Sequence, residues 1–176
     1  LHEALKLGDK IAIMRNGEVV QIGTPEDIVT NPADEYVSEF VQDASPAKVL
    51  TAGSIMSDVP VITYAWEGPK TALTLMQKSN KKLGYVVDQK RSFLGVITAK
   101  ELTRLCSGPE KYKHIPSSSI ETVDTVHPDV LIEELFVVAP KNPYPIPVVD
   151  EKNRLLGRIS SDTIFESIAL EGGSND

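Results

Sequence analysis

An internal repeat at an offset of 62 residues limits most strongly what this chain can fold into. Residues 85–98 lie over residues 147–160 without a gap, and seven of the fourteen aligned positions are identical. The identical pairs are Val86/Val148, Val87/Val149, Asp88/Asp150, Lys90/Lys152, Leu94/Leu156, Gly95/Gly157 and Ile97/Ile159. Self-similarity at a fixed offset is the signature of a repeated structural unit. The chain is therefore predicted to contain two copies of one unit, the first repeat and the second repeat.

The aligned segment of each repeat has the pattern of a strand, a turn, a second strand and a helix. The first apolar run is rich in Val and stops at an Asp, which suits the opening of a turn. The second run carries Leu-Gly-x-Ile, and a glycine inside a strand indicates a bulge or the close approach of another backbone. Thr98 and Ser160 follow, and each is expected to cap a helix.

Another strand and helix are expected ahead of each aligned segment. Residues 69–80 begin with a proline, and the equivalent helix follows Asp129 and is ended by Pro140. Short apolar strands are expected at 61–63 and 123–125. The unit is therefore β-α-β-β-α, twice, and the fold class is mixed α/β (α+β). Because units of about 55–60 residues bury too little surface alone, the two copies are expected to pack sheet against sheet.

The first 44 residues follow a different pattern. Residues 10–22 are two apolar runs joined by Asn16-Gly17, which predicts a β-hairpin. Thr24-Pro25-Glu26-Asp27 predicts a capped helix. An apolar stripe on a second helix is predicted at Tyr36, Val37, Phe40 and Val41. A hairpin and two short helices have little interior of their own, so this stripe needs a partner surface.

Charge and composition exclude several classes of protein. The net charge of −7 argues against a general nucleic-acid binder. Residues 1–44 alone have a net charge of −6. This uneven distribution of charge, together with a chain that begins at Leu1, suggests that the chain is part of a longer protein. Cys106 is the single cysteine, which excludes an internal disulfide and fits a reducing cytoplasm. Because the chain has only this cysteine and three histidines, a zinc site is not expected. No apolar run is long enough to span a bilayer.

The duplicated unit resembles a tandem pair of cystathionine-β-synthase (CBS) domains, whose repeats carry a hydrophobic-Val-Val-Asp … Leu-Gly-hydrophobic-hydrophobic-Thr/Ser signature. Arg158 departs from this pattern because it takes a hydrophobic place. Residues 1–17, 21–28 and 31–37 resemble the end of an ABC-transporter ATP-binding subunit. The continuation into a CBS pair is similar to the glycine betaine/proline (osmoprotectant) importers in particular.

The resemblance implies a division of the chain into six parts. These are a C-terminal remnant of an ABC ATP-binding domain (1–44), a linker (45–51), CBS domain 1 (52–107), a linker (108–112), CBS domain 2 (113–170) and a tail (171–176).

The resemblance also implies a regulatory rather than a catalytic role. The sequence has no Gly-x-x-x-x-Gly-Lys-Ser/Thr loop, no Leu-Ser-Gly-Gly-type signature and no apolar run ending in Asp-Glu. This chain is therefore not expected to hydrolyse ATP by itself, and no catalytic or metal-binding residue is assigned; ATP and Mg²⁺ belong to the remainder of a parent transport ATPase. The expected function is gating of transport by sensing ionic strength or an adenine nucleotide (AMP, ATP or cyclic di-AMP). The alternative is a structural dimerisation module without a ligand.

Candidate ligand residues follow from the same resemblance. In CBS pairs that bind adenosine compounds, an acidic residue six positions after the signature glycine holds the ribose hydroxyls. These positions are Glu101 and Thr163 in this chain. The acidic side chain of the first repeat is therefore longer than the usual Asp, and the second repeat has no carboxylate at this position. The capping-box pattern of Thr98 and Glu101 explains both residues without a ligand, so both interpretations stay open. The full candidate set is Thr63, Thr98, Glu101, Thr125, Ser160 and Thr163.

A basic surface and several partners complete the expectations. A basic helix face is predicted by the i, i+3, i+4 spacing of Lys78, Lys81 and Lys82. This face is either a solvated surface or a contact for anionic lipid headgroups or for an acidic partner. The first repeat (51–107) has a net charge of +4 and the second (113–170) of −4. The expected partners are a second copy through the CBS domains, a permease subunit, a substrate-binding protein and an anionic membrane surface, but no nucleic acid. The expected location is cytoplasmic, on the inner face of the cell membrane.

Overall fold

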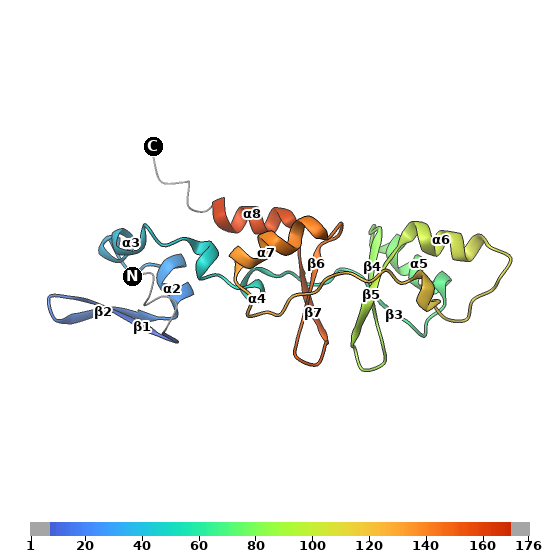
Figure 1. The fold of residues 1–176 in the computed structure, drawn as a ribbon, viewed down its shortest axis with the longest axis horizontal. Helices are drawn as coiled ribbons and strands as arrows, with labels where there is room; N and C mark the ends of the chain where they lie inside the picture. The colour runs from blue at the N-terminus through green and yellow to red at the C-terminus, as the bar shows by residue number, and fades with distance from the viewer. Residues whose placement is uncertain (1–7, 170–176) are drawn as a thin grey trace.

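A computed structural model describes residues 8–169 of the chain. Figure 1 shows an elongated molecule in which the second repeat lies between the N-terminal segment and the first repeat. The order of the three parts in space therefore differs from their order in the sequence. The expected tail at 171–176 and the first seven residues lie outside the described residues.

The N-terminal segment forms the predicted hairpin and two helices. Its elements are β1 (Ile11–Arg15), β2 (Glu18–Gly23), α2 (Pro25–Thr30) and α3 (Glu35–Val41). Asn16 and Gly17 have φ values of 54° and 86°, as a tight hairpin turn with two left-handed residues requires. The backbone N–H of Asp27 donates to Thr24 Oγ1 over 3.1 Å, and the Thr24 N–H donates to Asp27 Oδ2 over 3.0 Å. The predicted cap of α2 is therefore confirmed as a reciprocal capping box.

The first repeat has the predicted β-α-β-β-α order. Its elements are β3 (Ile62–Tyr64), α5 (Pro69–Lys78), β4 (Leu83–Val87), β5 (Phe93–Thr98) and α6 (Ala99–Ser107). β3 runs parallel to β4, and β4 runs antiparallel to β5. Helix α5 ends two residues earlier than predicted, because Asn80 adopts φ 51° and the N–H of Lys81 bonds back to the Met76 carbonyl over 2.9 Å.

The second repeat is less regular than its sequence predicts. Its elements are η2 (Ser117–Ser119), α7 (Ile132–Val138), η3 (Ala139–Lys141), β6 (Ile146–Val149), β7 (Leu155–Ile159) and α8 (Ser161–Ala169). The strand predicted at 123–125 is wrong: this stretch reaches the sheet through a single parallel bridge, Val126 to Val148. Helix α7 ends at Val138, two residues before Pro140, as predicted. Pro140 lies within the 3-10 turn η3, where its missing N–H removes no hydrogen bond of the first turn.

Each repeat is completed by the opening segment of the other repeat, and we call these two opening segments the crossing segments. Helix α4 (Ala52–Ile55) opens the first repeat in sequence, but the N–H of Ala52 donates to the carbonyl of Val130 in the second repeat over 2.7 Å. Ser57 and Arg158 exchange two backbone hydrogen bonds of 2.9 Å. In the same way, Val96 of the first repeat and Glu121 of the second exchange two backbone hydrogen bonds of 2.8 Å. The chain therefore crosses over twice between its two repeats.

The signature glycines lie where these crossing segments pass. A Cβ atom on Gly95 would lie 2.4 Å from the Glu121 carbonyl oxygen, and Gly95 has φ +145°. A Cβ atom on Gly157 would lie 2.9 Å from the Ser57 carbonyl oxygen. The close approach of another backbone that the glycines predict is confirmed at both positions.

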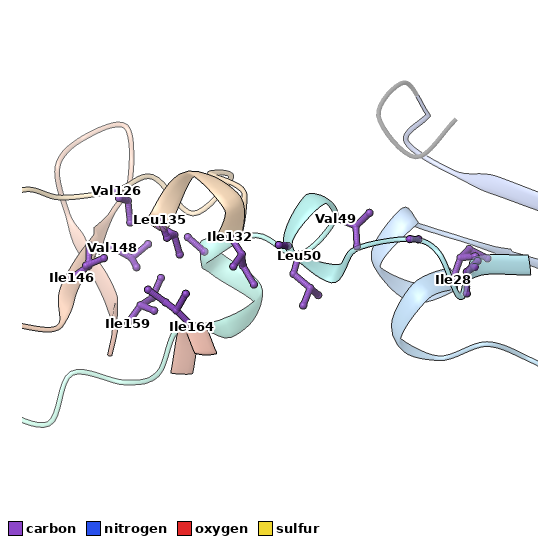
Figure 2. Packing of buried hydrophobic residues seen from close by; sticks show 14 of the residues in the cluster. Ile28, Val49, Leu50, Val126, Ile132, Leu135, Ile146, Val148, Ile159 and Ile164 are labelled. Carbon is purple, nitrogen blue, oxygen red and sulfur yellow. The ribbon is translucent and has the colours of Figure 1, made fainter. Parts of the chain in front are cut away.

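Three clusters of buried apolar side chains hold these parts together. One lies between the two sheets and consists of Tyr85, Val87, Phe93, Val96, Val149 and Leu155, so the predicted sheet-against-sheet packing is confirmed. A second fills the first repeat around Met76 and Leu102. The largest runs from Ile28 in the N-terminal segment, through Val49 and Leu50, to Ile132 in the second repeat (Figure 2). The η1 turn (Pro46–Lys48) and its neighbours are therefore part of the core.

The crossing at Gly95 yields a stability prediction. We expect Gly95→Ala to destabilise the chain by about 3 kcal/mol, because the new Cβ meets a backbone oxygen and φ is one that other residues rarely adopt. Gly17→Ala is the matched control, since Gly17 has positive φ but nothing within 4 Å, and its cost should be ~1 kcal/mol. Urea unfolding measures both, and equal losses would contradict the crossing as the cause.

Candidate functional site

The candidate site lies at the N-terminal end of α6, where the first repeat meets segments that lead into the second. One cavity of about 560 Å³ is lined by Leu73, Gln77, Lys82, Leu83, Thr98, Ala99, Lys100, Thr103, Tyr144 and Pro145. A neighbouring cavity of about 540 Å³ is lined by Val96, Ile97, Thr98, Lys100, Glu101, Ser118, Ser119, Ile120, Glu121 and Tyr144. Thr98, Lys100 and Tyr144 line both, so the two cavities lie side by side, and we call them together the α6 cleft.

Thr98 positions the start of helix α6. It ends β5, and its Oγ1 accepts the backbone N–H of Glu101 over 3.1 Å, which satisfies one of the free donors of the first turn. The side chain of Glu101 does not complete the predicted capping box. It turns to Arg104, whose Nε and Nη2 donate to its two carboxylate oxygens over 2.8 and 2.6 Å.

This ion pair sets the charge state of Glu101. Hydrogen bonds from the Arg104 guanidinium, and then from the Ser119 hydroxyl, lower the pKa of Glu101 from 4.5 to about 2. Glu101 therefore carries a full negative charge at neutral pH. Ser119 comes from the crossing segment, so both repeats contribute to the environment of this carboxylate.

Tyr144 closes the cleft from the side of the second repeat. Its hydroxyl donates to Glu121 Oε2 over 2.9 Å, and this bond raises the pKa of the phenol. Tyr144 lies in the loop before β6, and Glu121 lies in the crossing segment that pairs with Val96. The aromatic ring is thus held in place by a residue that is remote from it in sequence.

The corresponding position of the second repeat is chemically different. Ser160 Oγ and Thr163 Oγ1 lie 2.9 Å apart, and Ser160 Oγ also accepts the backbone N–H of Thr163 over 3.3 Å. The two hydroxyls bond to one another where the first repeat has a carboxylate. Asp162 lies one position before Thr163 and is exposed on α8.

The remaining predicted ligand residues lie elsewhere. Thr63 is fully buried in β3, and a Cβ added to Gly84 would meet its methyl group at 3.2 Å. Among the described residues, no group bonds to its Oγ1. Thr125 is exposed beside the bridging residue Val126. The structure thus brings together Thr98 with Glu101 and, at the other repeat, Ser160 with Thr163.

The predicted lysine face is not a helix face. Lys78 is the last residue of α5, whereas Lys81 and Lys82 follow the left-handed Asn80 and leave the helix. All three side chains are exposed, and Lys82 lines the α6 cleft. Sequence reasoning missed Lys82 as a cleft residue, together with Lys100, Ser119, Glu121 and Tyr144. The repeat alignment does not indicate that residues of the crossing segments lie close to Thr98.

Neither a cluster of metal ligands nor a membrane-spanning helix occurs within residues 8–169. No group of three or more His, Cys, Asp or Glu side chains in this range is placed to hold a metal ion. No helix in the same range is both long and apolar enough to cross a membrane.

The fold and the family match together define the class. Residues 52–108 match the CBS domain family. The described fold is similar to that of CBSX2 from Arabidopsis thaliana in complex with AMP, with a TM-score of 0.57 and 18% identity over 69% of this chain and 97% of that chain. The described residues thus have the fold of a CBS-domain pair, preceded by a separate segment.

Two curated relatives match the chain over essentially its whole length. The glycine betaine transport ATP-binding protein OpuAA of Bacillus subtilis (strain 168) is 38% identical over 100% of this chain and 40% of its own length. The glycine betaine/proline betaine transport system ATP-binding protein ProV of Salmonella typhimurium is 35% identical over 99% of this chain and 44% of its own. The chain thus spans less than half the length of these relatives. Its predicted resemblance to the CBS-carrying C-terminal part of such a subunit is confirmed.

The Glu101–Arg104 pair yields a pH prediction. Because the pKa of Glu101 falls from 4.5 to about 2 on folding, its contribution to stability is full above pH 4.5 and is lost as pH falls towards 2. We expect Arg104→Ala to raise this pKa towards 4.5, which NMR titration of the Glu101 carboxyl carbon measures. Arg154→Ala, which removes the comparable partner of Asp150, is the control and should leave Glu101 unchanged. An unchanged pKa in Arg104→Ala would contradict the assignment of the cause.

The position of Thr63 yields a second test. A buried hydroxyl without a partner costs about 1–3 kcal/mol, so Thr63→Val should raise the free energy of unfolding by ~1 kcal/mol. Thr98→Val is the contrasting variant, since it removes a helix cap and should lower stability by about 1 kcal/mol. Thermal unfolding measures both, and a loss of stability in Thr63→Val would indicate a partner for the hydroxyl.

Proposed function

We propose that this chain is the regulatory CBS module of an osmoprotectant ABC importer and that the α6 cleft binds an adenine nucleotide. The observation that carries the proposal is the composition of the cleft. Apolar walls, two lysines, an aromatic ring and the start of a helix meet in one place that both repeats line. Small-molecule sites have this character, since apolar walls supply burial and a few polar groups supply orientation.

The cleft offers distinct contacts to each part of a nucleotide. Lys82 and Lys100 offer ammonium groups for phosphate oxygens, and the dipole of α6 favours negative charge at the start of this helix. Leu73, Leu83 and the ring of Tyr144 offer apolar surface for a base. The AMP complex of CBSX2 supports this choice of ligand class.

Glu101 supplies the acceptor for a ribose. Its carboxylate stays ionised down to a pKa of about 2, so at neutral pH it accepts hydrogen bonds only. The CBS resemblance implies that ribose hydroxyls lie at this position, which supports the assignment. A ribose would share the carboxylate with Arg104, which already bonds to both oxygens. We therefore expect Glu101 to contribute less binding free energy to a ribose than a carboxylate without an ion-pair partner would.

The place of the module in a larger assembly follows from its relatives. The proposed division is an ATP-binding-domain remnant at 1–44 and CBS domains at 52–107 and 113–170, joined by linkers at 45–51 and 108–112. The proposed partners are the remainder of an ATP-binding subunit with its ATP and Mg²⁺, a permease subunit, a substrate-binding protein and a second copy of the CBS pair. The proposed location is the cytoplasmic face of the cell membrane.

Gating requires that a ligand or a salt condition favour one arrangement of the module over another. A nucleotide in the α6 cleft contacts both repeats and therefore favours the arrangement in which they are closed around it. Ionic strength is the second candidate signal, and the opposite net charges of the two repeats favour it. A ligand-free structural module remains the alternative and predicts no binding at all.

Calorimetry with AMP, ATP and cyclic di-AMP tests the nucleotide proposal. We expect at least one of them to bind, and Lys100→Ala to weaken that binding about tenfold, because an ammonium–phosphate bond is lost. Lys141→Ala is the matched control, since Lys141 is exposed on η3 and does not line the cleft. Absence of heat and of a melting shift with all three would contradict the nucleotide proposal and leave the response to ionic strength and the structural module.

A further inference from the structure

A cavity of about 640 Å³ lies where the N-terminal segment joins the second repeat, and we call it the joint cavity. Its wall comes from three parts of the chain: the ends of α2 and α3, residues 42–46 with Leu50, and Ser167 on α8. In Figure 1, the far end of α8 is directed towards the N-terminal segment. The volume lies in the range of roughly 300–1,000 Å³ that is typical of small-molecule sites.

Two hydroxyl groups of this wall have no proton left to donate. Thr30 Oγ1 donates to the Glu26 carbonyl over 2.8 Å, and it accepts a hydrogen bond from Asn31 Nδ2 over 3.0 Å. Ser167 Oγ donates to the Ile164 carbonyl over 2.8 Å. Because a hydroxyl has one proton and two lone pairs, Thr30 keeps one lone pair and Ser167 keeps two. Both groups can therefore only accept a hydrogen bond from a ligand.

Ser167 is an unusual residue for its position. It is 8% exposed and is one of two polar side chains that are buried in the described residues. Ile164, three residues earlier on the same face of α8, is buried as well. An apolar side chain would suit this face, whereas serine leaves an acceptor at the wall of a cavity. A ligand that donates hydrogen bonds gives this serine a function that packing does not.

The wall of the joint cavity also carries a negative charge. Asp43 lines it, and none of the four ion pairs in residues 8–169 includes Asp43. None of the described residues that line the cavity is basic, and the last turns of α2 and α3 contain no base. Lys48 is close in sequence, but it lines a different cavity. The cavity therefore offers a carboxylate without a cation of the protein itself.

The surrounding charges have the same sign. The N-terminal segment (1–44) has a net charge of −6, and α8 contains Asp162 and Glu166 but no Lys or Arg. Helix ends leave backbone carbonyls without intrahelical partners, and α2 and α3 both end at this cavity. Summed charges of one sign attract a ligand of the opposite sign and repel a phosphate. The joint cavity therefore suits a cation.

The rest of the wall limits the kind of cation. Val41 and Leu50 belong to the apolar cluster that joins the N-terminal segment to the second repeat, and Pro46 is buried beside them. Divalent metal ions take oxygen ligands on all sides, and a wall that is partly apolar does not supply them. A cation that carries methylene groups matches both kinds of wall.

From these observations we infer that the joint cavity binds a linear alkyl diamine or polyamine in its protonated form. An ammonium group has three N–H donors and no acceptor, which matches Asp43, Thr30 and Ser167. The methylene chain packs against Val41 and Leu50, and the net charge of −6 favours a ligand with more than one positive charge. The ligand contacts the N-terminal segment and the second repeat at once and therefore stabilises the joint between them. The site is separate from the α6 cleft, and the inference does not depend on nucleotide binding.

Calorimetry and thermal unfolding of the chain with putrescine and with spermidine, at constant ionic strength, test the inference. We expect both amines to bind and to raise the melting temperature. Tetramethylammonium is the matched ligand, because it carries a positive charge but no N–H group, and it should bind at least about tenfold more weakly. No heat and no melting shift with either amine would overturn the inference, and so would equal binding of tetramethylammonium.

Substitutions locate the bound amine. Asp43→Asn should weaken spermidine binding about tenfold, and Ser167→Ala about fivefold, because each removes an acceptor from the wall. Glu39→Gln is the matched control, since Glu39 is exposed on α3 and does not line the cavity. Equal losses in Asp43→Asn and Glu39→Gln would indicate diffuse attraction instead of a site. Unchanged binding in both Asp43→Asn and Ser167→Ala would place the amine elsewhere, and either result would overturn the inference.

The same variants separate this site from the α6 cleft. Lys100→Ala should leave amine binding unchanged, and Asp43→Asn should leave nucleotide binding unchanged, because neither residue lines the other site. Circular dichroism and thermal unfolding without ligand verify that each variant is folded. Amine binding without nucleotide binding would support the inference and contradict the nucleotide proposal, and nucleotide binding alone would do the reverse.

Discussion

The crossing of the chain between its repeats is the constraint on which the rest of the structure depends. Neither repeat is complete without the opening segment of the other, and backbone hydrogen bonds at Val96–Glu121 and Ser57–Arg158 fasten both segments. Backbone pairs of this kind admit only a residue without a Cβ atom beside them, which explains the glycine of each repeat. The α6 cleft is a direct consequence, because Ser119 and Glu121 reach it on one crossing segment and Tyr144 reaches it on the loop before β6.

The crossing also decides which repeat is joined to the N-terminal segment. Residues 44–52 lead to the first repeat in sequence, yet Val49 and Leu50 pack in the core of the second. The carbonyl of Leu50 accepts the N–H of Ile132 over 3.0 Å at the start of α7. Because this connection is buried and hydrogen-bonded, the N-terminal segment and the second repeat are expected to move as one unit. A ligand that changes the packing between the repeats therefore changes the position of the first repeat relative to both.

Local patterns in the sequence predicted the elements well, and long-range contacts account for what they missed. The hairpin at Asn16-Gly17 and the caps at Thr24 and Thr98 depend on neighbouring residues, so their chemistry is visible in the sequence. The strand at 123–125 failed because sheet pairing depends on a partner strand, and only Val126 finds one. The CBS resemblance identified the position of Glu101, but neither it nor the repeat alignment identified the partner Arg104 or Tyr144. The alignment compares equivalent positions, whereas the cleft joins non-equivalent ones.

Helix α5 connects the α6 cleft with the core of the first repeat. Leu73 and Gln77 line the cleft, whereas Ala72 and Met76 are buried in the core that the helix shares with β4 and β5. Because protein interiors are close-packed and transmit displacement, a ligand that shifts α5 would also shift the sheet on which this helix packs. If the proposed nucleotide favours one arrangement of the module, the coupling is reciprocal: that arrangement binds the nucleotide more tightly by the same factor.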